Sequence, residues 1–262
     1  MMMLNFFAAI GAWLRQSLAK LGFATRAFFT VVRACGSALR RPQLVIEQLH
    51  FIGNYSLLII AVSGLFVGMV LGLLGYNTLT NYGSEQALGL MVALALMREL
   101  GPVVTGLLFA GRAGTSLTAE IGLMKAGEQL SAMEMMAVNP IERVLAPRFL
   151  AGVIAMPVLA TIFTAIGIIG GYLVGVQLIG VDEGAFWSQM QSGVDVWKDI
   201  VNGVVIKSLV FGIAATFIAL FQGYQAEPTP DDVSRATTRT VVISSLTILW
   251  LDFMMTALMF SK

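Results

Sequence analysis

The segment "ALALMRELGPVVTGLLFAG", residues 93–111, decides the class of fold. Most of it is apolar enough to lie in a lipid bilayer, yet Arg98 and Glu99 stand in its middle and Gly101-Pro102 follows directly. Charged side chains are rare and costly inside a membrane, and they usually mark a cavity or a paired partner. The segment therefore predicts a membrane helix with a functional or structural reason to hold charge.

The composition of the whole chain supports a membrane protein. Its 262 residues are 57% hydrophobic and only 12% charged, too little charge to cover a soluble domain of this length. One cysteine and one histidine exclude an internal disulfide and argue against a Cys/His metal site. The net charge of +1 gives no indication of nucleic acid as a partner.

Five stretches are long enough to span a membrane, which needs about 20 mostly apolar residues. They are residues 52–76, 87–111, 149–178, 201–222 and 240–260. The N-terminal stretch 1–23 mixes aromatic and polar residues and predicts an amphipathic helix in the membrane interface, with a poorly formed first span as the alternative. The predicted organisation is all-α: an interfacial region, 1–50, and a five-span domain, 51–262.

The distribution of Lys and Arg predicts the orientation. The N-terminal segment, residues 112–148 and residues 223–239 hold 12 of the 16 basic residues, and with five spans these segments share one side. Basic residues are enriched on the cytoplasmic side. We therefore expect a cytoplasmic N-terminus and an external C-terminus.

Two spans carry glycine at every fourth position. These glycines are Gly64, Gly68 and Gly72 in the first span, and Gly167, Gly171 and Gly175 in the third. Such a stripe lets another backbone approach closely. We interpret both stripes as packing faces, within one subunit or between subunits.

Four ionisable residues fall inside the spans, namely Arg98, Glu99, Lys207 and Asp252. A rise of about 1.5 Å per residue places all four at a similar depth, near the midplane or in the outer half. Lys207 and Asp252 are predicted to form a buried polar pair. Consecutive helical residues point in different directions, so Arg98 and Glu99 need separate partners. Since Pro102 lacks an N–H, the carbonyl of Arg98 also loses its helical partner, which favours a polar pocket over simple pairing for Arg98 and Glu99.

The cytoplasmic connection 112–148 is predicted to contain one helix, "KAGEQLSAMEMMAV", ended by Asn139-Pro140. Leu130, Met133, Met136 and Ala137 share a face, and Glu128 and Glu134 lie off it. This face suits a docking partner, because Met adapts to a groove; packing against the chain's own spans is the alternative. No phosphate-binding loop G-x-x-x-x-G-K-[ST] occurs in the sequence. Any energised work therefore needs another chain.

The runs "RELGPVVTGLLFAGRAGTSLTAEIGLMKAGEQLSAMEMMAVNP", "SRATTRTVV", "SGLFVGMVLGLLGY" and "LDFMMTALMF" closely resemble the MlaE (YrbE-like) permeases. The resemblance covers the whole chain and is most specific in residues 98–140. It implies the permease subunit of an ABC-type phospholipid transporter. Such a transporter moves lipids between the inner and outer membranes and maintains outer-membrane asymmetry.

The resemblance also implies partners and site residues. The chain would form a homodimer in the bacterial inner membrane with an ABC ATPase, a STAS-domain subunit and a hexameric periplasmic MCE-domain protein. ATP and Mg would bind to the ATPase, so this chain is not itself an enzyme and holds no cofactor. The expected phospholipid site comprises Arg98, Glu99, Leu71, Leu74, Tyr76 and Leu79. The expected ATPase-docking residues are Glu120, Glu128, Leu130, Met133, Glu134 and Met136.

Other classes of function remain alternatives at this stage. An ion-coupled secondary carrier for lipid or solute would use Glu99 or Asp252 as a proton site and would need no ATPase. A membrane scaffold would tolerate neutralisation of all four buried charges. An ABC importer for small solutes is a nearer alternative, but the few charged pocket residues favour lipid.

Overall fold

The computed structural model describes residues 2–260 of the chain. Side chains of residues 2–14, 16–18, 20, 21 and 260 lie outside this description. The predicted amphipathic face of residues 1–23 therefore falls largely outside the described residues, although α1 (Met2–Leu39) is helical through this region. Its later part packs on α7 and η4 through Phe28, Val31 and Cys35.

All regular elements within residues 2–260 are helical. After α1 come α2 (Pro42–Thr80), η1 (Glu85–Ala87), α3 (Leu88–Ala95), η2 (Leu96–Leu100), α4 (Gly101–Phe109), η3 (Ala110–Gly114), α5 (Thr115–Ala126), α6 (Gln129–Met135), η4 (Ile141–Leu145), α7 (Ala146–Tyr172), η5 (Leu173–Leu178), α8 (Glu183–Gly193), η6 (Val196–Ile206), α9 (Lys207–Gln225) and α10 (Pro230–Phe260).

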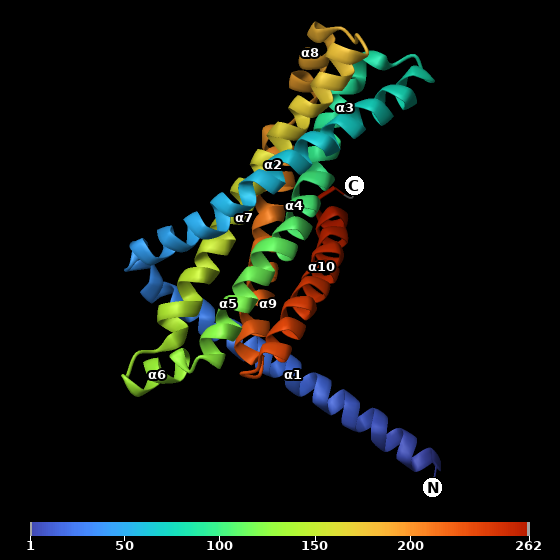
Figure 1. The fold of residues 1–262 in the computed structure, drawn as a ribbon. Helices are drawn as coiled ribbons and strands as arrows, with labels where there is room; N and C mark the ends of the chain where they lie inside the picture. Colours follow the sequence, from blue (N-terminus) through green and yellow to red (C-terminus); the bar gives the residue numbers. More distant parts are fainter. Residues whose placement is uncertain (1, 261–262) are drawn as a thin grey trace.

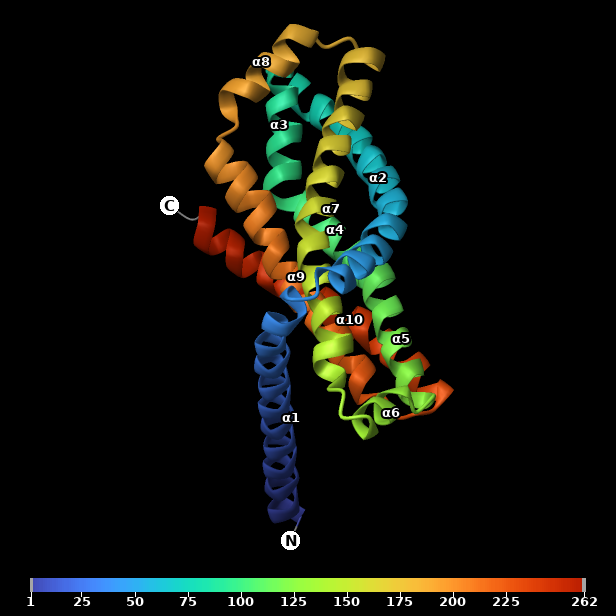
Figure 2. The same cartoon turned by 90° about the vertical axis from the view of Figure 1, so that its left-hand side faces the viewer.

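Five of the resulting continuous helical segments in residues 2–260 are long and apolar enough to cross a membrane, as predicted. They run over Pro42–Thr80, Glu85–Ala126, Ile141–Leu178, Val196–Gln225 and Pro230–Met259. Each is longer than the apolar run from which it was predicted, because polar flanking residues continue the helix. Figure 1 and Figure 2 show α6 and the α9–α10 connection at one end of the molecule, and α8 at the other.

The two glycine stripes meet each other inside the chain. A Cβ on Gly68 would lie 1.8 Å from the carbonyl oxygen of Gly167, and one on Gly72 would lie 3.0 Å from that of Gly171. The backbones of α2 and α7 are therefore in direct contact, and only glycine fits at Gly68. The predicted packing face is confirmed, and it lies within one subunit.

The second membrane helix continues beyond its predicted end at residue 111. α5 extends it to Ala126, so Arg112 lies inside the helix and not in a connection. Arg112 donates a hydrogen bond to Ser56 Oγ of α2 at 3.2 Å. The small residues of η3 and α5 allow this extension because they pack closely on α9 and α10.

The single helix predicted over residues 125–138 is wrong. The helix breaks at Gly127-Glu128, where Glu128 has φ +57°, and the short α6 then ends before Ala137, which has φ +60°. Positive φ disfavours helix continuation for residues with a Cβ. Sequence periodicity alone did not reveal these two breaks.

The helix α8 was not predicted, and it lies in the expected external connection between the third and fourth spans. Asp182 caps this helix, because its carboxylate accepts a hydrogen bond from the backbone N–H of Ala185 at 2.7 Å. A Cβ on Gly89 of α3 would lie only 2.1 Å from the carbonyl oxygen of Phe186. α8 therefore sits tightly against the start of the second membrane helix.

Candidate functional site

The backbone around Arg98 departs from a regular α-helix. Residues Leu96–Leu100 form one π-helical turn, and the N–H of Gly101 donates to the carbonyl of Leu96, five residues back. Pro102 follows inside α4 and has no N–H for the carbonyl of Arg98. π-turns are often found at functional sites because they leave backbone groups free for other partners.

Lys207 provides the partner for that carbonyl. Its Nζ donates to the Arg98 carbonyl at 2.7 Å, to Thr256 Oγ1 at 2.8 Å and to Glu99 Oε2 at 3.1 Å. It also forms an ion pair with Asp252 Oδ1 at 2.5 Å. The Lys207 side chain is fully buried, so its charge is compensated by protein groups from two other membrane helices, the one that carries Arg98 and Glu99 and the one that carries Asp252 and Thr256.

Arg98 turns to a different partner. Its Nε lies 2.7 Å from Oδ1 of Asp199, whose side chain is fully buried in η6. The second oxygen of Asp199 accepts a hydrogen bond from the backbone N–H of Asp195 at 2.8 Å. Arg98 and Glu99 thus have separate partners, Asp199 for Arg98, and Lys207 and Thr256 for Glu99.

Sequence reasoning missed two members of this polar cluster, Asp199 and Thr256. Asp199 was assigned to the external connection because the fourth span was expected to begin at residue 201. The helix begins at Val196, where the Asp195 carboxylate caps it by accepting from the N–H groups of Trp197 and Lys198. Asp195 is a typical N-cap residue, and it could have indicated that the helix begins early enough to include Asp199. Thr256 is an ordinary polar residue in the last span, and no sequence pattern indicated its role.

The predicted apolar residues of α2 do not gather around the cluster within one chain. Leu71 lines a groove of about 270 Å³ with Phe66, Val67, Val70 and Leu100. Tyr76 and Leu79 pack partly against the core, whereas Leu74 is largely exposed. Leu100 lies two residues beyond Arg98 on the same turn, so the groove and the guanidinium face different directions.

The residues predicted to dock the ATPase separate into two groups. Leu130 is buried and Met133 half-buried in the chain's own core. These two residues of the predicted docking face are therefore not exposed to a partner. Glu120 lies on α5, not on α6, and pairs with Arg148. Glu128, Glu134 and Met136 remain exposed. Met135, which was not predicted, is 84% exposed.

Within residues 2–260, five membrane-length helices that hold the buried charges of Lys207 and Asp199 define a polytopic α-helical membrane protein. Buried charges of this kind often mark a substrate path in such proteins. Residues 45–258 match the model of the family described as Permease MlaE. The chain therefore belongs to the MlaE permease family.

Similar proteins from three organisms each align with most of this chain. One is a Haemophilus influenzae protein named intermembrane phospholipid transport system permease protein MlaE, 56% identical over 99% of both chains. Another, a probable ABC transporter permease of Rickettsia typhi, is 37% identical over 87% of this chain and 88% of the relative. A chloroplast protein of Arabidopsis thaliana, named trigalactosyldiacylglycerol 1, is 30% identical over 82% of this chain and 61% of the relative.

Proposed function

We propose that this chain is the membrane-spanning permease subunit of an ABC-type transporter that moves phospholipid between the inner and outer membranes and so maintains outer-membrane lipid asymmetry. The observation that carries the proposal is the 56% identity, over essentially the full length of both chains, to a relative named as an intermembrane phospholipid transport permease. The Rickettsia relative, named as an ABC transporter permease, supports the ABC class.

The polar cluster supports a lipid substrate. Arg98 retains 32% side-chain exposure and Glu99 41%, so both border the surface of the bundle at membrane depth. A guanidinium suits phosphate geometry because it offers paired donors in one plane. Asp199 and the Lys207 network fix the backbone and side chain of this turn, so that Arg98 is held ready for a headgroup phosphate.

A second copy of the chain would complete the pocket. The groove at Leu71 is smaller than the roughly 300–1,000 Å³ of typical small-molecule sites, and it faces away from Arg98. One chain therefore does not surround a two-tailed lipid. A homodimer in the inner membrane would enclose a pocket from two copies of Arg98, Glu99, Leu71, Leu74, Tyr76 and Leu79.

The remaining partners follow from the same proposal. A separate ATPase, binding ATP and Mg, would dock on the exposed part of the α6 region, around Glu128, Glu134 and Met136. A STAS-domain subunit would accompany it in the cytoplasm. A hexameric MCE-domain protein would receive lipid at the periplasmic end, where α8 lies.

The test is transfer of a fluorescent phospholipid between vesicles by the reconstituted complex. Arg98→Gln alone would leave Asp199 buried and unpaired, which costs several kcal/mol, so the informative variant is Arg98→Gln with Asp199→Asn. This double variant should keep the ATPase bound and lose at least about 10-fold in transfer, or roughly 1.4 kcal/mol of interaction. The matched control is Lys198→Gln, which removes an exposed neighbouring charge.

Normal transfer by the double variant would refute the phosphate role of Arg98. Transfer by the permease alone, without ATPase or ATP, would instead support an ion-coupled carrier for lipid or solute and refute the ABC class. These two outcomes are independent, since the first concerns one side chain and the second the source of energy.

A further inference from the structure

A second polar site lies at the other end of α2, where the chain turns from α1 into α2. A pocket of about 430 Å³ opens there, lined by Ser37, Ala38, Arg40, Arg41, Leu44, Ala137, Val138, Asn139, Glu142 and Arg143. Leu44 and Leu71 are 27 residues apart on one continuous helix, or about 40 Å at 1.5 Å per residue. The pocket is therefore separate from the cluster at Arg98.

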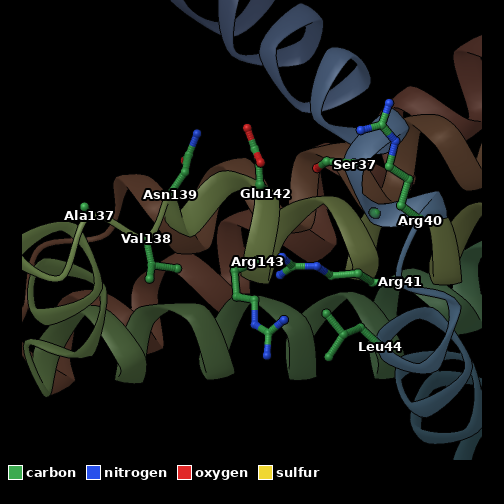
Figure 3. Close-up of a pocket in the computed structure, with 10 residues that line it drawn as sticks. Ser37, Arg40, Arg41, Leu44, Ala137, Val138, Asn139, Glu142 and Arg143 are labelled. Carbon is green, nitrogen blue, oxygen red and sulfur yellow. The ribbon is translucent and has the colours of Figure 1, made fainter.

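The pocket has an excess of positive charge. Three arginines, Arg40, Arg41 and Arg143, line it, but only one carboxylate does, that of Glu142. Figure 3 shows Arg41 reaching from the α1–α2 corner toward Arg143 on η4, and Glu142 pointing away from both. Within the described part of the chain, no ion pair involves any of these three arginines. Two guanidinium groups that approach each other repel unless an anion lies between them.

The start of α2 adds to this preference for an anion. Arg40, Arg41 and Arg143 also line an adjoining hollow with Pro42, Gln43 and Leu44, the first residues of α2. No side chain caps this helix. Its first N–H groups and its dipole favour negative charge at the same point.

Apolar surface on both sides of the pocket indicates that the anion belongs to a lipid. Leu39, at the end of α1, is 66% exposed, and Ile46, in the second turn of α2, is 62% exposed. Ile46 follows Arg41 by five residues, about 8 Å along the helix. That spacing matches the roughly 5–8 Å of headgroup layer outside the hydrocarbon core. A free phosphate has no apolar part that could pack against these flanking residues.

We infer that Arg40, Arg41 and Arg143 form a binding site for the phosphate of an anionic phospholipid in the leaflet next to α1. Basic pockets beside membrane helices on the cytoplasmic side suit such headgroups. The bound phosphate bridges η4 and the α1–α2 corner, and its acyl chains lie along the exposed apolar side chains. This site does not depend on the proposed transport function, since it concerns resident lipid at the opposite end of the spans.

Native mass spectrometry of the full-length chain, with its copurified partners, tests the site by titration with phosphatidylglycerol or phosphatidylethanolamine. The wild-type protein should bind phosphatidylglycerol more tightly. Arg41→Gln with Arg143→Gln should weaken that binding about 10-fold, the equivalent of one charge-assisted contact. The matched control Arg33→Gln removes an exposed α1 arginine outside the pocket and should change nothing.

Glu142→Gln gives a second test, in which binding is expected to become tighter. A misfolded variant would not give that result. Removing the only carboxylate of the pocket should tighten phosphatidylglycerol binding several-fold. Equal binding of both lipids, or unchanged binding in the Arg41/Arg143 variant, would overturn the site. Full displacement by inorganic phosphate would show a free-phosphate site and overturn the lipid assignment. If the Arg41/Arg143 variant lost ATPase copurification but kept its lipid binding, a protein carboxylate would occupy the pocket. That result would also overturn the lipid assignment.

Discussion

Lys207 shows what single residues contribute to this molecule. Its ammonium group contacts the Arg98 carbonyl, Glu99, Thr256 and Asp252, and thereby joins three membrane-spanning segments at one level. That Lys207 and Asp252 meet at a common level was predictable because helical rise is constant. Pro102 predicted that the Arg98 carbonyl lacks its helical donor, but Lys207 as the partner of that carbonyl was not predicted.

Replacing Lys207 by Met should destabilise the protein strongly. Asp252 and Glu99 would lose their cationic partner inside the bundle, and breaking a buried pair from one side costs about 3–5 kcal/mol. Adding Asp252→Asn should restore a large part of that loss, because an amide carries no uncompensated charge. Thermal unfolding in detergent micelles measures both variants.

The control for this comparison is Thr256→Val, which removes one hydroxyl from the same cluster. Hydrogen bonds between membrane helices are worth only about 0.6 kcal/mol on average, so this change should be small. Equal instability of the single and double Lys207 variants would mean that charge compensation is not what Lys207 provides.

At the scale of helices, the sequence revealed the faces but not their partners. The four-residue spacing of Gly64, Gly68 and Gly72 predicted a smooth stripe, and whether it packed within or between subunits depended on tertiary contacts that no local pattern contains. The breaks around α6 were missed for a related reason. Glu128 and Ala137 adopt left-handed conformations that their side chains do not favour, so only the surrounding fold imposes them.

Gly68→Ala should disrupt the contact between α2 and α7. The new Cβ would lie 1.8 Å from a backbone oxygen, so the helices must separate, and overpacking of this kind costs about 1–3 kcal/mol or more. Gly53→Ala is the matched control on the same helix, where a Cβ meets nothing within 4 Å. There alanine should be neutral or stabilising by up to about 1 kcal/mol, because it favours helix.

Unfolding of the two variants under identical detergent conditions gives the comparison. The expected order of stability is Gly53→Ala, then the wild type, then Gly68→Ala. If Gly68→Ala were as stable as the wild type, the close backbone approach of α2 and α7 would not exist in the membrane.

For the whole molecule, orientation in the membrane is the property that charge alone predicts. The segments rich in Lys and Arg were expected to share one side, and α6 and the α9–α10 connection do lie at one end of the molecule, opposite α8 (Figure 1, Figure 2). Basic residues at that end predict that it lies in the cytoplasm, with a cytoplasmic N-terminus and an external C-terminus, and this orientation remains a prediction.

Cysteine labelling tests this orientation with two exposed serines at opposite ends. Ser188→Cys on α8 should react with a membrane-impermeant maleimide in cells whose outer membrane is permeabilised, and Ser234→Cys on α10 only after the inner membrane is broken.

Burial raises the pKa of the native Cys35 thiol. Because the thiolate is the reactive form, Cys35 should label slowly near neutral pH and faster as pH rises, and Cys35→Ser removes this background. The reverse pattern of labelling would place α6 and the N-terminus outside, and with them every site assigned here to the cytoplasmic face.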